Sequence, residues 1–364
     1  MLYIPAGSWL YLSMAKRKIL VAPLNWGLGH ATRCIPIINA LVGEGFEPVI
    51  ASDGGALNLL KNEFPGLISH ELSGYNIKYA SSAFFFRSKL LLQTPHILKT
   101  ISAEKKQTAQ IIKDEKIVGI ISDSRWGVHN EDVPSVFITH QVNVLSGLTT
   151  GLSSKIHKSY IKKFDECWVP DVEGDPNLSG IMGHVKDGNL KLKYIGILSR
   201  FRKLDLPLKY DIAVILSGPE PQRRILQKVV EAELIGKNLQ VVVVEGLIEG
   251  GQRSFTRQNI TTYNFMLSGQ LEEVMNQSSI IICRPGYTSL MDLAALQKSL
   301  FIIPTPGQYE QEYLFKKLKS EGLAEGCYQK NFKYDLLKDI EGSNLGRFGN
   351  GARFSGSFSL FKGK

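Results

Sequence analysis

The chain has 364 residues, of which 43% are hydrophobic and 21% charged. This composition excludes a chain that is disordered over most of its length, and the length suggests two domains. No uninterrupted apolar run approaches the ~20 residues of a membrane-spanning helix. The formal net charge of +9 favours anionic partners, namely nucleotides, phospholipid headgroups or nucleic acid.

The four cysteines are isolated and form no Cys-x-x-Cys pair; they are Cys34, Cys167, Cys283 and Cys327. This spacing favours a reducing cytoplasm over a secreted disulfide framework, and it argues against a zinc site.

Both ends of the chain differ from the rest. Residues 1–13 are apolar, and basic residues follow at 16–18. Because a signal peptide has the reverse order, we expect Met14 to be the natural start, with a short N-terminal anchor as the alternative. Residues 342–364 are rich in Gly and Ser and lack periodicity, which predicts a disordered tail.

Short β-branched runs alternate with amphipathic segments between residues 14 and 200. The pattern predicts strands at 18–24, 48–52, 67–71, 118–122, 136–139 and 166–169, and helices at 31–44, 56–63, 88–114 and 146–163. Buried apolar strands separated by helices indicate a parallel sheet covered on both faces.

A basic stretch at 198–209 predicts a linker, after which the rhythm restarts. Strands are expected at 212–216, 239–244, 260–263, 280–283 and 300–303, and helices at 221–233, 270–276, 288–296 and 309–321. We therefore predict two facing Rossmann-like α/β domains, residues 14–200 and 201–341, with a cleft at the carboxyl ends of the strands.

The loop after the first strand holds Gly27, Gly29 and His30. Its glycines permit a sharp turn, and the following helix offers N–H groups to an anion or a polar substrate. Thr32 replaces the third glycine of a dinucleotide fingerprint, although Asp53 stands where a ribose-binding acid would. A sugar-substrate loop is therefore preferred to a nicotinamide site, while His30 is either functional or a helix cap.

The corresponding loop of the second domain holds Ser217 and Gly218, and Arg223 and Arg224 follow in the first helical turns. Hydroxyl, backbone and guanidinium groups in this order suit a phosphate. For each arginine, an ordinary solvated position is the alternative.

The most informative segment is Cys283–Ala295, where a strand ends, Gly286 turns the chain, and Thr288 and Ser289 open a helix. Their hydroxyls and the helix N-terminus could hold a diphosphate without a metal. Asp292, further along this helix, could bind ribose hydroxyls. The Pro-rich loop that follows the next strand would offer Glu310 and Gln311 to a sugar.

This segment resembles the C-terminal donor domain of family 28 glycosyltransferases. That family includes the enzyme that adds N-acetylglucosamine to the peptidoglycan lipid intermediate and the plant galactolipid synthases. Its pattern is Arg-x-Gly-x-x-(Ser/Thr)-x-x-(Asp/Glu), followed by Gln-x-x-Gln-x-x-Asn. The matching residues are Arg284, Gly286, Ser289, Asp292, Gln308 and Gln311.

The resemblance implies the two-domain GT-B fold and places Gly27, Gly29 and His30 on the family's first glycine-rich loop, beside the acceptor. The chain departs from the pattern at Leu314, where the family has Asn. A terminal helix that returns to the first domain is not recognisable either.

A general base near an acceptor hydroxyl must be a histidine or a carboxylate. The candidates are His30, Asp123 and His140, the last two of which follow predicted strands. For Asp123 the alternatives are a helix cap or a partner of Arg125, and for His140 a buried, hydrogen-bonded histidine.

Residues 79–92 combine three consecutive phenylalanines with Arg87 and Lys89. Aromatic rings beside cations suit an interfacial membrane contact and a lipid-linked acceptor, and the alternative is that the rings are core.

Together these features predict an inverting hexosyltransferase without a cofactor. We expect it to be metal-independent, because no Asp-x-Asp motif occurs. Its donor would be a UDP-sugar and its acceptor a hydroxyl compound of the cell envelope. It would lie in the cytoplasm, in contact with the inner face of the membrane. The alternatives are a nucleotide-sugar 2-epimerase and a non-catalytic nucleotide-sugar-binding protein; nucleic-acid binding rests on charge alone and ranks last.

Overall fold

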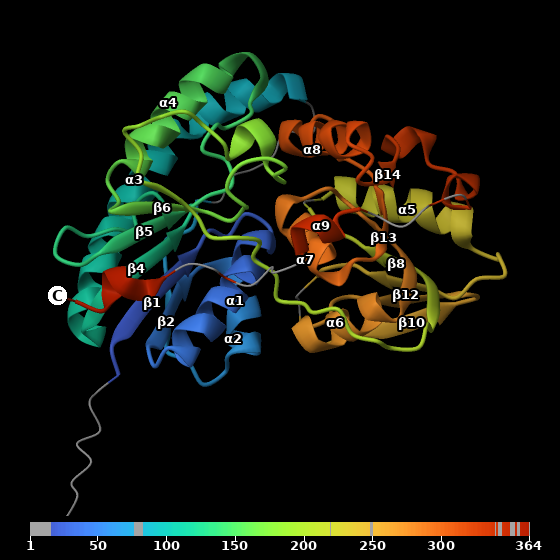
Figure 1. Cartoon of the computed structure of the whole chain (residues 1–364), viewed down its shortest axis with the longest axis horizontal. Coiled ribbons are helices and arrows are strands. Elements are labelled where there is room, and N and C mark those ends of the chain that lie inside the picture. Colours follow the sequence, from blue (N-terminus) through green and yellow to red (C-terminus); the bar gives the residue numbers. More distant parts are fainter. Residues whose placement is uncertain are drawn as a thin grey trace, which may run out of the picture.

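The computed structural model describes residues 16–75, 83–218, 220–247, 250–338, 340, 344–349, 354 and 357–363; the side chains of residues 83–93 lie outside that description. Figure 1 shows two α/β domains side by side, each with a central sheet covered by helices. The predicted fold class, two Rossmann-like domains with parallel sheets, is confirmed.

The first domain is built on a seven-stranded sheet with the order β3-β2-β1-β4-β5-β6-β7. Its strands, all parallel to their neighbours, are β1 (Lys18–Pro23), β2 (Glu47–Ser52), β3 (Ser69–Glu71), β4 (Ile117–Asp123), β5 (Ser135–Ile138), β6 (Glu166–Val169) and β7 (Leu192–Tyr194). The helices are α1 (Gly29–Gly43), α2 (Gly54–Glu63), α3 (Ala83–Glu115) and α4 (Thr150–Ile161), with 3-10 turns at Gly147–Thr149 and Gly180–Met182.

The sequence of β1 explains its central place. Residues 19–22 are Ile-Leu-Val-Ala, and all four are fully buried because helices cover both faces of the sheet. In register with β1, the last residue of β4 is Asp123, which pairs with Pro23. A carboxylate therefore stands at the carboxyl edge of the sheet, next to the loop that leads into α1.

The second domain repeats this plan with the order β10-β11-β9-β8-β12-β13-β14. Its strands are β8 (Tyr210–Ile215), β9 (Val241–Val244), β10 (Ser254–Arg257), β11 (Ile260–Tyr263), β12 (Ser278–Cys283), β13 (Ser299–Ile302) and β14 (Glu325–Gly326), and only β10 is antiparallel to its neighbour. The helices are α5 (Gln222–Leu234), α6 (Ser268–Asn276), α7 (Tyr287–Leu296), α8 (Tyr309–Ser320) and α9 (Gly346–Gly349), with 3-10 turns at Gln329–Asn331, Tyr334–Leu337 and Phe358–Phe361.

The strands that the sequence did not predict are β7, β10 and β14, each at or beside the edge of its sheet. All four residues of β10 are exposed, so its sequence has no apolar periodicity to detect. Short edge strands of this kind depend on the neighbouring strand rather than on their own sequence.

The C-terminal residues correct the expectation of a disordered tail. Phe358 and Phe361 are fully buried, and a Cβ added at Gly119 of β4 would lie 2.3 Å from the ring of Phe361. Figure 1 shows this end of the chain beside β1 and β4 of the first domain. The returning segment was missed because glycine and serine obscure the spacing of Phe354, Phe358 and Phe361, which suits one helical face.

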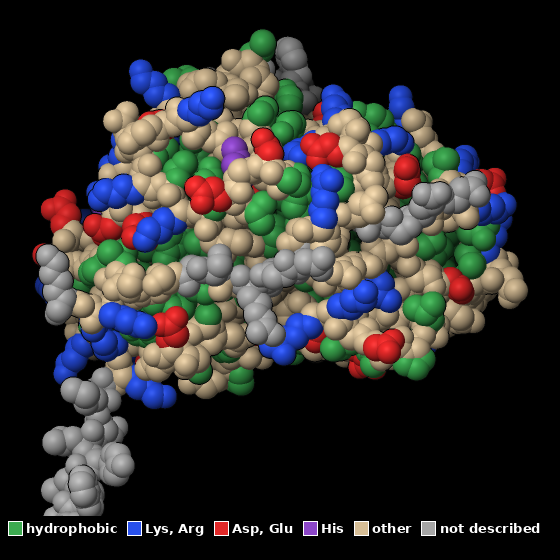
Figure 2. Space-filling model, viewed as in Figure 1, with side chains coloured by type: hydrophobic (Ala, Val, Ile, Leu, Met, Phe, Trp, Pro, Cys, Tyr) green, Lys and Arg blue, Asp and Glu red, His purple; other side chains and the backbone are tan. Residues whose placement is uncertain are grey.

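Charge is spread over the face of the molecule that Figure 2 shows. On the face in Figure 2, Lys and Arg side chains are distributed over both domains and alternate with acidic ones. Within the described part of the chain, no helix is both long and apolar enough to cross a bilayer.

We predict that Phe361→Ala lowers the free energy of unfolding by about 3 kcal/mol, because removing a buried ring leaves a cavity between the tail and β4. Denaturant-induced unfolding measures the change, and Ser359→Ala, at an exposed position of the same turn, is the control. Equal stability of Phe361→Ala and the control would contradict the packed tail.

Candidate functional site

The start of α1 faces the start of α7 from the other domain. The hydroxyl of Thr288 donates to the carbonyl oxygen of Gly29 at 3.2 Å. A Cβ at position 29 would stand only 3.1 Å from Thr288 Oγ1, so glycine allows the two helix starts to approach this closely. Gly27 has φ +72°, a left-handed conformation that glycine adopts without strain.

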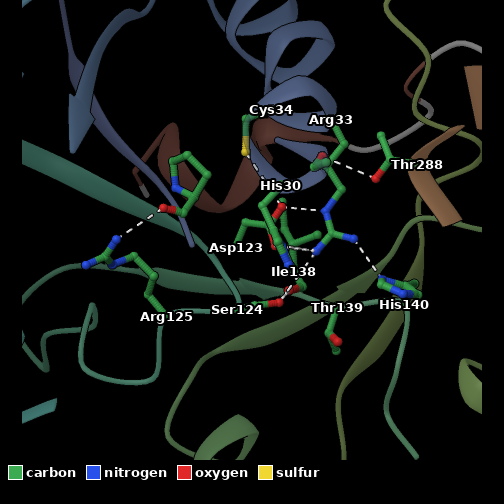
Figure 3. Close-up of polar contacts among 12 residues, drawn as sticks. His30, Arg33, Cys34, Asp123, Ser124, Arg125, Ile138, Thr139, His140 and Thr288 are labelled. Atoms are coloured by element: carbon green, nitrogen blue, oxygen red, sulfur yellow. Dashed lines mark hydrogen bonds and ion pairs between the residues drawn. The ribbon is translucent and has the colours of Figure 1, made fainter. Parts of the chain in front are cut away.

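His30 and Asp123 form a hydrogen-bonded pair at this point (Figure 3). His30 Nδ1 lies 2.8 Å from Asp123 Oδ1; the carboxylate is fully buried, and 16% of the imidazole is exposed. Because an ionised carboxylate only accepts, Nδ1 carries the proton and Nε2 is left as an acceptor.

The ionisation of this pair is set by burial and by a cation. Burial lowers the pKa of His30, and the nearby Asp123 charge only partly opposes this. Burial also raises the pKa of Asp123, but Arg33 and His30 outweigh it and leave that pKa below the ordinary value. At neutral pH, the pair is therefore a neutral imidazole beside a carboxylate, the state that a general base requires.

Arg33, which the sequence analysis did not select, completes the cluster. It lies one turn after His30 on α1, is 1% exposed, and donates to both carboxylate oxygens of Asp123. Its Nη1 also lies 2.8 Å from His140 Nδ1. The i, i+3 spacing from His30 was the available signal, because such residues share a helix face.

His140 connects the two domains. Its Nδ1 accepts from Arg33, so its Nε2 carries the proton and donates to Glu310 Oε1 of α8 at 3.0 Å. Gln141 donates to the other oxygen of Glu310 at 2.7 Å. The imidazole also stacks on the ring of Tyr287, with centroids 4.4 Å apart. Burial raises the pKa of Glu310, but His140 outweighs it, so the carboxylate remains ionised.

Arg284 makes contacts that were not predicted for it. The side chain is fully buried, and its guanidinium donates to the carbonyl oxygens of Ile303 (3.0 Å), Pro304 (2.9 Å) and Gln222 (3.0 Å). Burial lowers its pKa to about 10, which still leaves it charged at neutral pH. Arg284 therefore holds these loops together, and a role in donor binding stays a prediction.

Asp292 is also placed differently from the prediction. Its Oδ1 accepts from the Ser199 hydroxyl at 2.8 Å and from the Arg200 backbone N–H at 3.3 Å. The Arg200 guanidinium lies 3.7 Å from its other oxygen. Burial raises the pKa of Asp292 more than Arg200 lowers it. The carboxylate thus holds the linker between the domains, rather than standing open for a ribose.

The loop between β8 and α5 of the second domain makes contacts within itself. Arg223 Nη2 donates to Glu220 at 2.6 Å, so this predicted phosphate ligand already has an anionic partner. Ser217 is half-buried and Gly218 is exposed, with φ +93°.

The remaining predicted donor-binding residues lie at the starts of α7 and α8. Gly286, Thr288 and Ser289 are half-buried at the start of α7. Gln308 caps α8 by accepting from the Gln311 backbone N–H, and Gln311 Oε1 accepts from Thr305 N at 2.8 Å. The structure therefore gathers Gly29, His30, Asp123, His140, Thr288 and Glu310 where the two domains meet, and places Arg223, Arg284 and Asp292 in other contacts.

Metal ligands are not gathered in the same way. Among the described residues, no group of three or more His, Cys, Asp or Glu side chains could hold a metal ion.

Comparison with known families agrees with this arrangement. Residues 214–347 match the profile of the glycosyltransferase family 28 C-terminal domain. The second domain is therefore similar to this family. The resemblance predicted from the sequence is thereby confirmed.

Curated relatives are distant. One is a UDP-N-acetylglucosamine--N-acetylmuramyl-(pentapeptide) pyrophosphoryl-undecaprenol N-acetylglucosamine transferase of Bacillus cytotoxicus, 25% identical over 208 residues. That match covers 55% of this chain, and the chain spans only about half (56%) of the length of the Bacillus enzyme. An uncharacterized glycosyltransferase of Methanosarcina mazei is 22% identical over 332 residues, covering 84% of both chains.

Solved structures with the same fold are glycosyltransferases. The enzyme SnogD from Streptomyces nogalater superposes with a TM-score of 0.61 at 12% identity, over 94% of this chain and 92% of its own. The kitacinnamycin glycotransferase gives 0.59 at 13% identity, over 92% and 91%. At this identity the likeness supports the GT-B fold and carries no information on substrate.

We predict that Asp292→Ala lowers the free energy of unfolding by about 2 kcal/mol, because a buried, charge-assisted contact to the linker is lost. Chemical denaturation measures the change, with Asp205→Ala, an exposed linker position, as the control. Calorimetry with UDP is run on the same protein. Unchanged stability with a loss of UDP affinity would contradict the linker role and support ribose binding.

Proposed function

We propose that the protein is an inverting glycosyltransferase that moves a sugar from a UDP-sugar to a hydroxyl acceptor. The observation that carries the proposal is the His30–Asp123 pair, because it stands where the first domain meets the start of α7 in the family 28 domain. The Bacillus relative, whose name specifies a UDP-N-acetylglucosamine donor, supports the choice of nucleotide.

In this mechanism, His30 Nε2 takes the proton of the acceptor hydroxyl while the acceptor oxygen attacks the anomeric carbon. The bond from that carbon to the diphosphate oxygen breaks, and the electron pair leaves with the diphosphate. Asp123 stabilises the imidazolium that forms, and holds its ring in place through Nδ1. One displacement at the anomeric carbon inverts its configuration.

The leaving diphosphate would be received by the N-terminus of α7. The first N–H groups of a helix have no partner within the helix, and the helix dipole makes this end positive. Gly286 leaves room for an anion there, and the hydroxyls of Thr288 and Ser289 add donors. Such preorganised donors can stabilise a leaving group without a metal, which agrees with the absence of an Asp-x-Asp motif from the sequence.

We predict that His30→Gln lowers the rate of UDP release in the presence of acceptor by 10²-fold or more, as expected for loss of a general base. UDP affinity should persist, because His30 lies on the acceptor side. A panel of UDP-sugars is screened with lipid-linked and soluble acceptors, and His70→Gln, on β3, is the control.

Three results would contradict the proposal. Equal rates in His30→Gln and the control would remove His30 as the base. Epimerised sugar formed without an acceptor would indicate a nucleotide-sugar 2-epimerase. UDP binding without turnover on any acceptor would indicate a non-catalytic binding protein.

The acceptor is proposed to be lipid-linked and presented at the cytoplasmic face of the membrane. The support is a surface that we call the α4 face, made of exposed Leu148 (91%), Leu152 (63%) and Ile156 (45%). These residues recur every fourth position, so they share one side of the turn and helix. Gly147, next to Leu148, lies close to Tyr309 of α8, so this face adjoins the second domain next to Glu310.

The charge of the α4 face suits an anionic surface. Residues 146–163 include no acidic residue and three exposed lysines, Lys155, Lys162 and Lys163, while the fourth, Lys158, pairs with Asp187 at 3.8 Å. Each cation near an anionic bilayer adds about 1 kcal/mol. The contact predicted at residues 84–92 lies outside the described side chains and stays a prediction.

We predict that replacing Leu148 and Leu152 by Ser weakens binding to anionic phospholipid vesicles about tenfold, because their apolar surface no longer enters the lipid. Sedimentation with vesicles measures the effect. The control replaces Leu208 and Leu336, two exposed leucines elsewhere, by Ser. Equal sedimentation of the two double variants would contradict a membrane role for the α4 face.

A further inference from the structure

A continuous chain of polar contacts runs from one domain into the reacting pair of the other. Glu310 of α8 accepts from His140 at 3.0 Å, and His140 accepts from Arg33 at 2.8 Å. Arg33 in turn donates to both carboxylate oxygens of Asp123, and Asp123 Oδ1 lies 2.8 Å from His30 Nδ1. Figure 3 shows Arg33 between His140 and Asp123.

Arg33 is built into this chain rather than solvated. It is 1% exposed, and its fork-shaped guanidinium matches a carboxylate at two points, which fixes the orientation of both groups. Its Nη2 also lies 2.9 Å from His30 Nδ1. When His30 is neutral with its proton on Nδ1, both nitrogens are donors and neither accepts from the other. Both donate to Asp123 Oδ1 instead, so the positive charge of Arg33 lies directly beside the imidazole.

The contact between His140 and Glu310 exists only when the domains are this close. It selects the tautomer of His140 with the proton on Nε2, which leaves Nδ1 as the acceptor for Arg33. Separation of the domains would take Glu310 away from His140 and remove this selection.

We propose that Arg33 is a positioning residue that locks the Asp123–His30 pair and, through His140 and Glu310, makes this lock depend on closure of the two domains. This inference rests on the proposed function, because it assigns a control to the same base. Its consequence is that the base is aligned only when the donor domain is in place, which limits proton transfer in the open state.

Polar and charged groups from several elements surround the His30–Asp123 pair. They are Arg33 and Cys34 on α1, Ser124 after β4, His140 and Gln141 after β5, Thr288 on α7 and Glu310 on α8. Arg33 is the cation that both bonds the carboxylate and lowers the pKa of His30. Its removal should therefore raise the pH at which the pair takes up a proton.

The first test is NMR titration of the His30 ring in the free protein, without substrate. Arg33→Met should move the titration upward by about one pH unit, because a nearby positive charge is removed. Arg33→Lys keeps the charge and loses the fork, so its shift should be smaller and its folding less affected. An unchanged titration in a folded Arg33→Met or an equal shift in both variants would overturn the electrostatic part of the proposal.

The second test follows the Arg33 Nη1–H signal, because Nη1 is the atom that donates to His140. Glu310→Gln retains an oxygen acceptor for His140 and should keep the signal, whereas Glu310→Ala should lose it. A signal that survives in Glu310→Ala would overturn the link to closure.

Turnover separates this inference from the proposed function. In an active enzyme, Arg33→Lys should lower kcat at least tenfold and leave UDP affinity unchanged; an unchanged kcat would overturn the positioning role. If the wild-type protein transfers no sugar, the proposed function fails, while the two NMR results still decide whether Arg33 controls the pair.

Discussion

The site depends on one buried charge. Asp123 ends the central strand β4 and is fully excluded from water, and an ionised carboxylate in such a place is tolerated only when it is paired and hydrogen-bonded. Arg33 and His30 provide those partners from the first turns of α1. The start of α1 must therefore point at the end of β4, and the turn at Gly27 makes that direction possible. The contacts that stabilise the buried carboxylate also orient His30, with its Nε2 free to accept a proton.

Two carboxylates of the second domain are subject to the same requirement for partners. Glu310 is held by His140 and Gln141, and Asp292 by Ser199 and Arg200 of the linker. A substrate that uses Glu310 must exchange with these contacts. The proposed donor would meet these interdomain hydrogen bonds of α8, while Asp292 ties α7 to the linker between the domains.

Sequence reasoning succeeded where a pattern is local and failed where a partner is distant. The apolar run of β1 predicted a buried central strand, and the polar residues after β4 and β5 predicted that Asp123 and His140 would lie at the cleft. Arg33 was missed because a lone arginine on a helix is ordinarily solvated, and only the carboxylate 90 residues away reveals its role. Asp292 was predicted to face a ribose. Its contact with the linker could not be predicted, because the linker has no periodicity that would place it. Phe358 and Phe361 were hidden by glycine and serine in a tail that becomes buried only against β4 and β6.

The contacts between the domains are numerous but individually weak. Thr288 bonds Gly29, Tyr287 bonds the carbonyl of Pro170, and Ser268 bonds Glu63. A single hydrogen bond contributes about 1 kcal/mol net, since water replaces it on opening. Buried apolar residues of both domains also pack in one continuous cluster, so these hydrogen bonds are not the whole of the interface. The hydrogen bonds and the shared apolar cluster together hold the start of α1 against α7, at the place where His30 is aligned with Asp123.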